Sequence, residues 1–153
     1  MPETTDTIFS KIIRGEVPSH KVYEDQHCIV ILDIAPLSEG HALVIPKEPA
    51  RSMDELSDDA AAGVGRVMPR VCRALKKVTG CEAYNVLQNN GEAAGQSVHH
   101  VHFHIIPRFA DRGAPISGKP DQHNGPGLQM QWQPGTLTPE AAKEIGMQVK
   151  RLL

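Results

Sequence analysis

The chain has 153 residues, which suits one domain with a substantial buried core, and we expect a single domain over residues 1–153. Its 16 Lys and Arg residues against 18 Asp and Glu residues give a formal net charge of −2, which excludes a strongly basic surface that holds nucleic acid or acidic lipid by charge. No apolar stretch reaches membrane-spanning length, so we expect neither nucleic acid nor a membrane as a partner.

The first third of the chain predicts a short helix followed by three strands. Asp6 is a candidate N-cap for a helix with apolar residues on one side, and Gly15 ends that helix. Strands are predicted over residues 21–24, 28–33 and 41–46, and a turn at residues 25–26 makes the first two an antiparallel hairpin. Asp33 thus ends one strand and His41 begins the next, so the two residues flank one loop.

The rest of the chain predicts two helices, a strand and a long loop. Ser52 begins a sequence that resembles a capping box, and apolar residues then recur at helical spacing until Gly80 ends the helix. Pro69 predicts a kink or a local break within that helix. The other predicted elements are a strand over residues 82–88, a Gly- and Pro-rich loop over residues 111–136 and a C-terminal helix over residues 138–152.

The three cysteines bear on the cellular compartment. Cys28, Cys72 and Cys81 are odd in number and lack the spacing of a metal or redox motif. The N-terminal residues are polar and acidic, without the apolar core of a signal peptide. Reduced thiols in a cytoplasmic protein fit this pattern.

Histidines alternate with apolar residues near residue 100. From His100 onward, the sequence reads His-Val-His-Phe-His, and this period of two predicts a strand with three imidazoles on one face and its apolar residues in the core. Isolated histidines are often bystanders, and His99 suits that interpretation. A metal site is the weaker alternative, because residues i and i+4 of a strand lie roughly 13 Å apart. At most a neighbouring pair of these histidines could chelate one ion.

The loop before this strand contains small residues and hydrogen-bond donors. Residues 89–98 include Gly95, which lets a ligand approach the backbone, and Gln96 and Ser97, which add side-chain donors. Donors beside a row of imidazoles suit a phosphoryl group.

These segments together resemble the histidine triad (HIT) family, whose signature is His-φ-His-φ-His-φ-φ with φ apolar. Residues 95–108 carry that pattern, and residues 33–47 and 8–18 resemble two other segments of the family. The likeness covers a core of about residues 7–108, and the Gln-Ser pair before the triad is similar to the Hint-like branch. The resemblance implies an α+β, HIT-like fold in which one antiparallel sheet carries the triad and helices cover one face.

The resemblance also implies an activity. A HIT protein of this branch would hydrolyse or transfer at the α-phosphate of purine nucleoside 5′-phosphoramidates or dinucleoside polyphosphates, through a nucleotidyl-histidine intermediate. His102 corresponds to the nucleophile, oriented by the carbonyl of His100. The other expected catalytic residues are His104, at the phosphoryl oxygens, and His41 and His100, which orient their neighbours. The expected substrate-binding residues are Asp33 and Ile34 at the ribose and base, Asn89, and Gly95, Gln96 and Ser97 at the phosphate.

One departure from the family concerns metal. Several bacterial relatives hold a structural zinc at positions that correspond to Thr7, Ser10 and Pro49, and these residue types cannot supply thiolate or imidazole ligands. We therefore expect no structural zinc and no metal cofactor, with Mg²⁺ present only alongside a polyphosphate substrate. The resemblance further implies a homodimer.

Two rival functions stay open from the sequence. A metal-dependent hydrolase would use an imidazole pair with Asp33 or His41. A nucleotide sensor would keep the cleft but lose turnover, although the intact His102 argues against it. The sequence leaves open the physiological leaving group and the base preference.

The loop over residues 111–136 is expected to tune substrate choice. Within it Leu128, Met130 and Trp132 alternate like a strand. Trp132 is a possible specificity residue beside the leaving group, where an indole offers stacking area and one N–H donor. The alternative is that Trp132 pins the C-terminal helix to the core.

Overall fold

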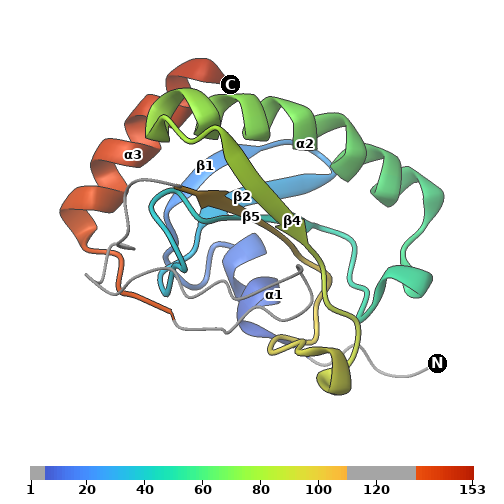
Figure 1. Cartoon of the computed structure of the whole chain (residues 1–153). Coiled ribbons are helices and arrows are strands. Elements are labelled where there is room, and N and C mark those ends of the chain that lie inside the picture. Colours follow the sequence, from blue (N-terminus) through green and yellow to red (C-terminus); the bar gives the residue numbers. More distant parts are fainter. Residues whose placement is uncertain (1–5, 110–133) are drawn as a thin grey trace.

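A five-stranded antiparallel sheet is the centre of the fold (Figure 1), as seen in a computed structural model that describes residues 6–109 and 134–153. The strands lie in the order β1-β2-β3-β5-β4, and every neighbouring pair is antiparallel. Their bounds are β1 Lys21–Glu24, β2 Cys28–Leu32, β3 Ala42–Pro46, β4 Ala83–Leu87 and β5 Phe103–Arg108. The predicted α+β fold with one antiparallel sheet is confirmed.

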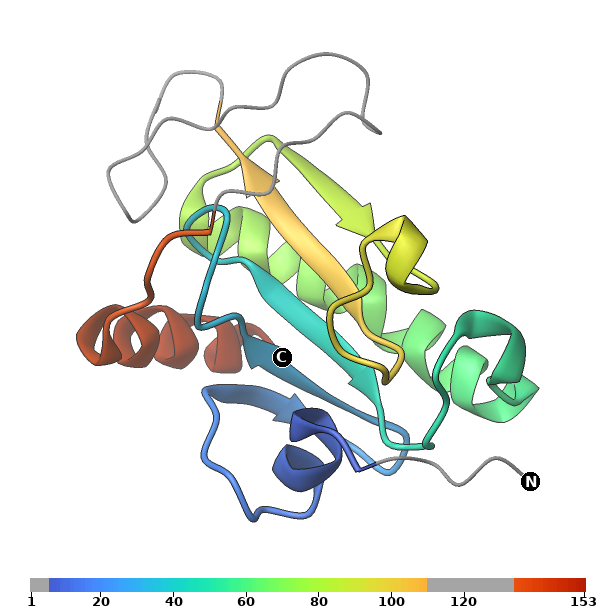
Figure 2. The same cartoon turned by 90° about the horizontal axis from the view of Figure 1, so that it is seen from below.

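Helices pack on both faces of this sheet (Figures 1 and 2). The long helices α2 (Asp58–Thr79) and α3 (Pro139–Leu152) share one apolar core with the sheet. The short helix α1 (Ile8–Ile13) packs Phe9 against the opposite face. The prediction that helices cover one face therefore holds for the two long helices but not for α1.

Burial on both faces explains the composition of the two central strands. Every residue of β2 and β3 is buried, so these strands read as continuous apolar runs rather than alternating ones. Within β2, Val30 belongs to the core under α2 and α3, whereas Ile29 and Ile31 belong to the cluster around Phe9. Adjacent residues of one strand thus serve opposite layers.

The start of α1 differs from the prediction. Thr7, not Asp6, is the N-cap, and its hydroxyl accepts from the Ser10 N–H at 3.3 Å. The Ser10 hydroxyl accepts from the Thr7 N–H at 3.1 Å, which completes a reciprocal capping box. Asp6 instead binds the guanidinium of Arg14 through both carboxylate oxygens.

The elements around α2 also shift from their predicted form. Ser52 makes no side-chain cap and precedes a short 3₁₀ helix, η1 (Met53–Glu55), while Ser57 caps α2 by accepting from the Ala60 N–H at 3.1 Å. Pro69 lies inside α2 without ending it. Gly80 ends the helix in the left-handed conformation with φ 76°, as its position after the last turn predicts.

The triad strand begins later than predicted. β5 starts at Phe103, so His100, which lies in a bend, and His102 both precede the strand. The pairing ends here because the Val101 N–H donates to the carbonyl of Ala50 at 2.9 Å instead of to β3. The predicted alternation still holds, since Val101 and Ile105 are fully buried while His100 and His102 contact Phe9 on the α1 side.

The remaining expectations concern the cysteines, membrane-spanning helices and the Gly- and Pro-rich loop. Cys28, Cys72 and Cys81 are free and buried, as predicted, while the cytoplasmic location stays a prediction. In the described ranges, no helix has the length and apolar character that crossing a membrane requires. Trp132 and residues 111–133 of the Gly- and Pro-rich loop lie outside the described residues.

Candidate active site

The backbone fixes the protonation state of the middle triad histidine. His102 Nδ1 lies 2.7 Å from the carbonyl oxygen of His100. A carbonyl can only accept, so Nδ1 carries the proton and Nε2 keeps its lone pair. The carbonyl of the residue two positions earlier therefore leaves His102 Nε2 free to act as a base or nucleophile.

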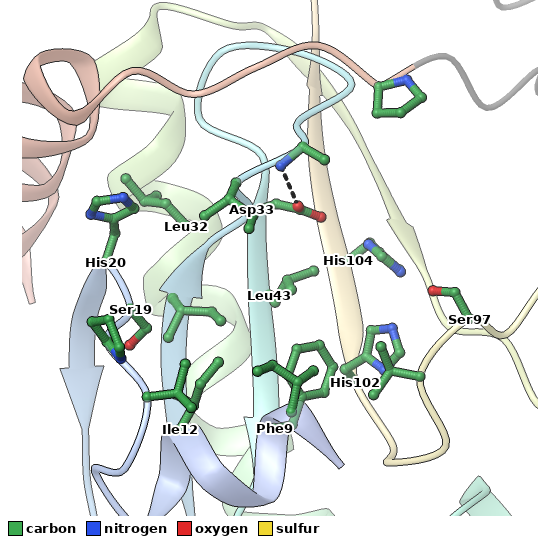
Figure 3. Close-up of a pocket in the computed structure, with 18 residues that line it drawn as sticks. Phe9, Ile12, Ser19, His20, Leu32, Asp33, Leu43, Ser97, His102 and His104 are labelled. Carbon is green, nitrogen blue, oxygen red and sulfur yellow. Dashed lines mark hydrogen bonds between the residues drawn. The ribbon is translucent and has the colours of Figure 1, made fainter.

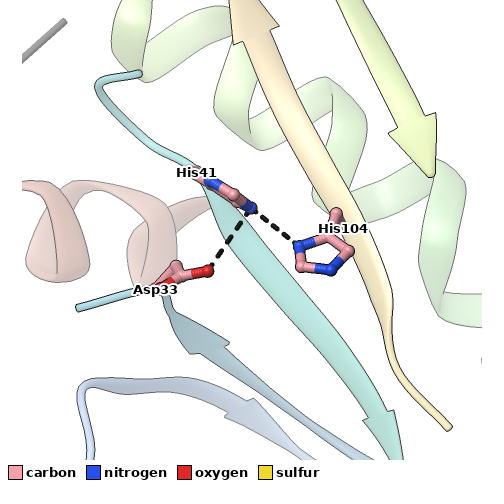
Figure 4. A group of neighbouring side chains, drawn as sticks. All are labelled: Asp33, His41 and His104. Atoms are coloured by element: carbon pink, nitrogen blue, oxygen red, sulfur yellow. Dashed lines mark hydrogen bonds and ion pairs between the residues drawn. The ribbon is translucent and has the colours of Figure 1, made fainter. Parts of the chain in front are cut away.

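A second backbone group fixes the opposite state at His104 (Figure 4). The Leu37 N–H donates to His41 Nδ1 at 3.0 Å, which leaves the His41 proton on Nε2. That proton points to His104 Nδ1 at 2.9 Å, so the His104 proton must lie on its own Nε2. His104 is thus a donor on the nitrogen where His102 is an acceptor.

His100 holds the start of the triad in place. Its ring Nε2 lies 2.7 Å from the carbonyl of Pro46 at the end of β3, to which it must donate. Phe9 of α1 meets the rings of His100 and His102 edge-on, with the His102 ring centroid 4.9 Å away. His100 therefore acts by positioning, through its own ring and through the carbonyl that orients His102.

Burial keeps these imidazoles neutral. It lowers the pKa of His100 and of His102, although the hydrogen bond that each ring donates to a carbonyl opposes the shift. Burial, with repulsion from a charged His102, lowers the pKa of His104 to about 3. Burial and the neighbouring His104 hold the pKa of His41 well below its usual value. The lone pair of His102 Nε2 is consequently available at neutral pH.

Asp33 lies beside this pair of histidines and could form a cation site with them. Its Oδ2 is 3.5 Å from His41 Nε2, and potential ligand atoms of Asp33, His41 and His104 all lie within 4.8 Å of one another. A metal ligand must offer a lone pair, whereas the Leu37 hydrogen bond leaves His41 Nε2 protonated. The trio fits a hydrogen-bonded cluster better than a metal centre. Burial raises the pKa of Asp33, and the hydrogen bond that its carboxylate accepts from the Ala35 N–H opposes this rise.

A cavity of about 340 Å³ opens in front of His102 and His104 (Figure 3). One end is walled by apolar side chains of α1, the following segment, and β2 and β3. The other end contains the two histidines and Ser97, whose side chain lies across from them. The described residues that line it are Ile8, Phe9, Ile12, Val17, Pro18, Ser19, His20, Ile31, Leu32, Asp33, Ile34, Ala35, Leu43, Ser97, Val98, His102, His104 and Pro134.

Comparisons with known proteins give the family. The HIT domain profile matches residues 14–111, well over half of the chain. The chain belongs to the HIT family. The adenosine 5′-monophosphoramidase hnt1 of Schizosaccharomyces pombe is 44% identical over 142 residues, which cover 93% of this chain and 94% of that protein.

Two further relatives extend the comparison. The adenylylsulfatase HINT3 of Arabidopsis thaliana is 48% identical over 103 residues, 67% of this chain and 52% of that protein. A crystal structure of a Hit-like protein from Bartonella henselae superposes with a TM-score of 0.80 and 31% identity, and covers 97% of this chain and 96% of that one. The HIT-like fold extends through the C-terminal helix.

Some of the residues expected from the HIT resemblance line the cavity and others stand behind it. Lining residues are Asp33, Ile34, Ser97, His102 and His104. His41 and His100 lie one layer back, in contact with the triad through the hydrogen bonds described above. Asn89 and Gly95 do not line this cavity, although the two lie near each other in the loop before the triad.

Gln96 organises that loop with its side chain. The amide nitrogen donates to the carbonyls of Arg51 and Val98, at 2.7 and 2.9 Å, and the amide oxygen accepts from the Gly91 N–H at 2.7 Å. Both amide hydrogens are thereby used, and the residue is only 6% exposed. In this structure Gln96 holds Ser97 in position rather than offering a donor to a ligand.

Sequence reasoning missed the apolar wall of the cavity. The sequence predicts α1 only as a short helix with apolar residues on one side, and it predicts no binding role for this helix or for the segment after it. The resemblance of residues 8–18 to a HIT segment could have indicated this role, because a helix that serves only packing need not resemble a family segment. The missed lining residues include Ile8, Phe9, Ile12, Val17, Ser19 and His20.

The positions that correspond to zinc ligands in other HIT proteins do come together. Ser10, Pro49 and His100 line a small pocket with Asp6, Arg14 and Lys47. The hydroxyls of Ser10 and Thr7 are occupied by the capping box of α1. These residues do not fit a structural zinc, because they offer one imidazole and no thiolate.

The buried neutral imidazoles predict a stability that falls on acidification. Their folded pKa values lie below the unfolded value near 6.5, so the unfolded chain binds more protons as the pH falls below 6.5. Urea unfolding should show a nearly constant free energy between about pH 7 and 8 and a loss between about pH 6.5 and 5, at up to about 1.4 kcal/mol per pH unit for each histidine.

Two observations make this test specific. Carboxyl groups with lowered pKa values, such as those of Glu24 and Asp25, titrate below this window. Asp33, whose pKa is raised by burial, contributes with the opposite sign, since its protonation on acidification favours the folded chain. A free energy of unfolding that stays flat from pH 6.5 to 5 would contradict the neutral state of the triad.

Proposed function

We propose that this HIT protein hydrolyses nucleotides substituted at the α-phosphate, and that it does so through a nucleotidyl-histidine intermediate on His102. The observation that carries the proposal is the opposed protonation of two neighbouring imidazoles in one cavity: a lone pair on His102 and a donor on His104. The monophosphoramidase hnt1 and the adenylylsulfatase HINT3 support the same class of reaction.

In the first step, His102 displaces the leaving group. The lone pair of Nε2 forms a bond to the α-phosphorus while the bond from phosphorus to the leaving nitrogen or oxygen breaks, and the leaving atom keeps the electron pair. Ser97 supplies a proton to that atom and recovers one from water. The positive charge that develops on the His102 ring is stabilised by the carbonyl of His100, to which Nδ1–H already donates.

In the second step, water releases the nucleotide. A water oxygen bonds to phosphorus, the bond to His102 breaks, and its electron pair returns to Nε2. The proton lost by this water balances the one that the leaving group took. The His104 Nε2–H, with loop amides near Gly95, stabilises the phosphoryl oxygens in both steps. No step requires a metal.

The nucleoside occupies the apolar end of the cavity. A purine ring fits among the side chains of α1 and β2, such as Phe9 and Ile31. Asp33 stands between this end and the histidines, where its carboxylate can accept from ribose hydroxyls, and the exposed Ile34 covers the base. Phosphoramidates are the favoured substrates and dinucleoside polyphosphates the alternative.

Replacement of His102 tests the covalent mechanism. In His102→Ala, kcat on an AMP amide should fall by several powers of ten, because the nucleophile acts on the barrier while the cavity holds the ground state. AMP affinity, measured by calorimetry, should change only modestly. Wild-type protein denatured in alkaline detergent, which preserves the acid-labile bond between phosphorus and the histidine nitrogen, should carry labelled adenylate that the variant lacks.

A retained rate would reject this mechanism. If His102→Ala keeps more than about a tenth of the wild-type kcat, the barrier has changed by less than about 1.4 kcal/mol and His102 is not the nucleophile. If AMP binds but neither protein turns over any substrate, the sensor function replaces the hydrolase.

We also propose that the HIT domain forms a homodimer through β4. This strand is one edge of the sheet, and exposed edges pair readily with a second chain. Tyr84 and Val86 are 40% and 49% exposed on it, so apolar area accompanies the unpaired backbone. A second copy that pairs at the same strand would cover both.

A charged residue on this strand should separate the dimer. Sedimentation of the wild type should give about twice the chain mass of 16.7 kDa, and Val86→Glu should shift it toward the monomer because two buried carboxylates would face each other. Met147→Glu, at a similarly exposed apolar position on α3, is the matched control. A monomeric wild type would refute the dimer.

Chelator treatment tests the absence of a metal requirement. Because the positions of a HIT zinc site hold Thr7, Ser10 and Pro49, activity on an AMP amide should survive dialysis against EDTA unchanged. A phosphoramidate is used because Mg²⁺ also binds polyphosphate substrates. Stoichiometric zinc in protein purified without added metal, or inactivation that metal reverses, would overturn this expectation.

A further inference from the structure

A second cavity adjoins the active site on the far side of Ser97. Its volume is about 330 Å³, and Ile8, Ser97 and Val98 line both cavities. Its remaining described lining residues are Asp6, Thr7, Arg51 and His99. The two spaces therefore meet at the residue that faces His102 and His104 (Figure 3).

The direction of the substrate follows from this arrangement, on the basis of the proposed function. With the nucleoside in the apolar end, the α-phosphate lies at His102 and His104. Displacement in line requires the leaving group to point away from the attacking His102 Nε2. Ser97 stands across from the histidines, so the leaving group passes Ser97 and enters the second cavity.

Arg51 brings a cationic side chain to this cavity. The other charged groups of the cavity already have partners: the Asp6 carboxylate accepts two hydrogen bonds from Arg14, which also binds Glu16, and His99 lies 3.4 Å from the carboxylate of Glu92. The nearby Glu55 carboxylate accepts from the backbone N–H of Arg51 at 3.0 Å. In the part of the chain that the structure describes, the Arg51 guanidinium has no ion-pair partner.

The backbone of Arg51 is fixed relative to the reacting groups. Its carbonyl accepts from the side chain of Gln96, the neighbour of Ser97, at 2.7 Å. The preceding carbonyl, that of Ala50, accepts from the Val101 N–H, next to His102. The guanidinium is thus carried on a segment that is tied to both sides of the catalytic centre.

We propose that Arg51 selects leaving groups that carry a negative charge near the scissile bond. The shared chemistry is an anionic oxygen group, whether an amino-acid carboxylate, a sulfate or a phosphate chain. The reaction is the one described above: the leaving atom departs with the bonding pair and one proton, and Arg51 pairs with the anion beside it. Arg51 makes no bond to phosphorus and acts on specificity.

The test compares two substrates of nearly equal shape. AMP joined through nitrogen to glycine carries a carboxylate, and AMP joined to glycinamide carries a neutral amide. The measured quantity is the glycine-to-glycinamide ratio of kcat/KM in each variant. This ratio is independent of the amount of active protein. Its change from one variant to another is also independent of the intrinsic reactivity of the two amines. Added salt should lower the ratio in the wild type.

Substitutions at Arg51 change only its side chain, so the backbone carbonyl that accepts from Gln96 is retained. Arg51→Gln should lower the glycine-to-glycinamide ratio about fivefold, and Arg51→Glu by more than about tenfold, as for one partly exposed charge pair lost and then reversed. Arg51→Lys should retain most of the preference. Arg66→Glu, an equal charge change on an exposed position of α2, is the control and should leave the ratio unchanged.

Adenosine 5′-phosphosulfate and diadenosine triphosphate are measured as two further anionic substrates. The anionic substrate whose kcat/KM falls furthest in Arg51→Gln identifies the source of the charge. Equal ratios in the wild type, Arg51→Glu and Arg66→Glu, with good turnover of AMP amides, would overturn the role of Arg51 and leave the proposed function standing. No turnover of any substrate by the wild type would overturn both.

Discussion

The site depends on one hydrogen bond, from the Leu37 N–H to His41 Nδ1. A backbone N–H cannot become an acceptor, so this bond sets the tautomer of His41 and, through the 2.9 Å contact, that of His104. Reversing the relay would set two N–H groups against each other at a residue that is 1% exposed, and an unsatisfied buried group costs about 1–3 kcal/mol. The loop between β2 and β3 thus determines which nitrogen of His104 carries the proton.

The same device operates at His102 with the opposite sign, because a carbonyl there takes the place of the N–H. Two identical side chains, two residues apart, are given complementary roles by main-chain groups. Burial then keeps both rings neutral, although four buried imidazoles reduce stability whenever the medium is acidic enough to charge the unfolded chain. The active site therefore accepts a stability cost at low pH in exchange for an unprotonated His102 Nε2 at neutral pH.

Sequence patterns predicted the parts of this structure that depend on periodicity. The hairpin of β1 and β2, the long helix ended by Gly80 and the alternation of His100, His102 and His104 all follow from local rules. The tautomers could not be predicted, since Leu37 contributes only its N–H and any residue except proline has one. The start of β5 was also beyond local rules, because the Ala50 carbonyl that draws Val101 from the sheet is distant in sequence. Long-range side-chain contacts decided the role of Gln96 in the same way, since its type alone suits a ligand donor equally well.

Gln96 is also the reason that the two cavities can act together. Its three hydrogen bonds join the turn at Gly91, the segment after β3 at Arg51 and the backbone at Val98. Ser97 lies between two of these anchors, so it cannot move without disturbing bonds at a buried amide. A displacement of the segment at Arg51 would act on Ser97 through the same amide. The fold consequently couples Ser97, which faces His102 and His104, to Arg51 in the adjoining cavity.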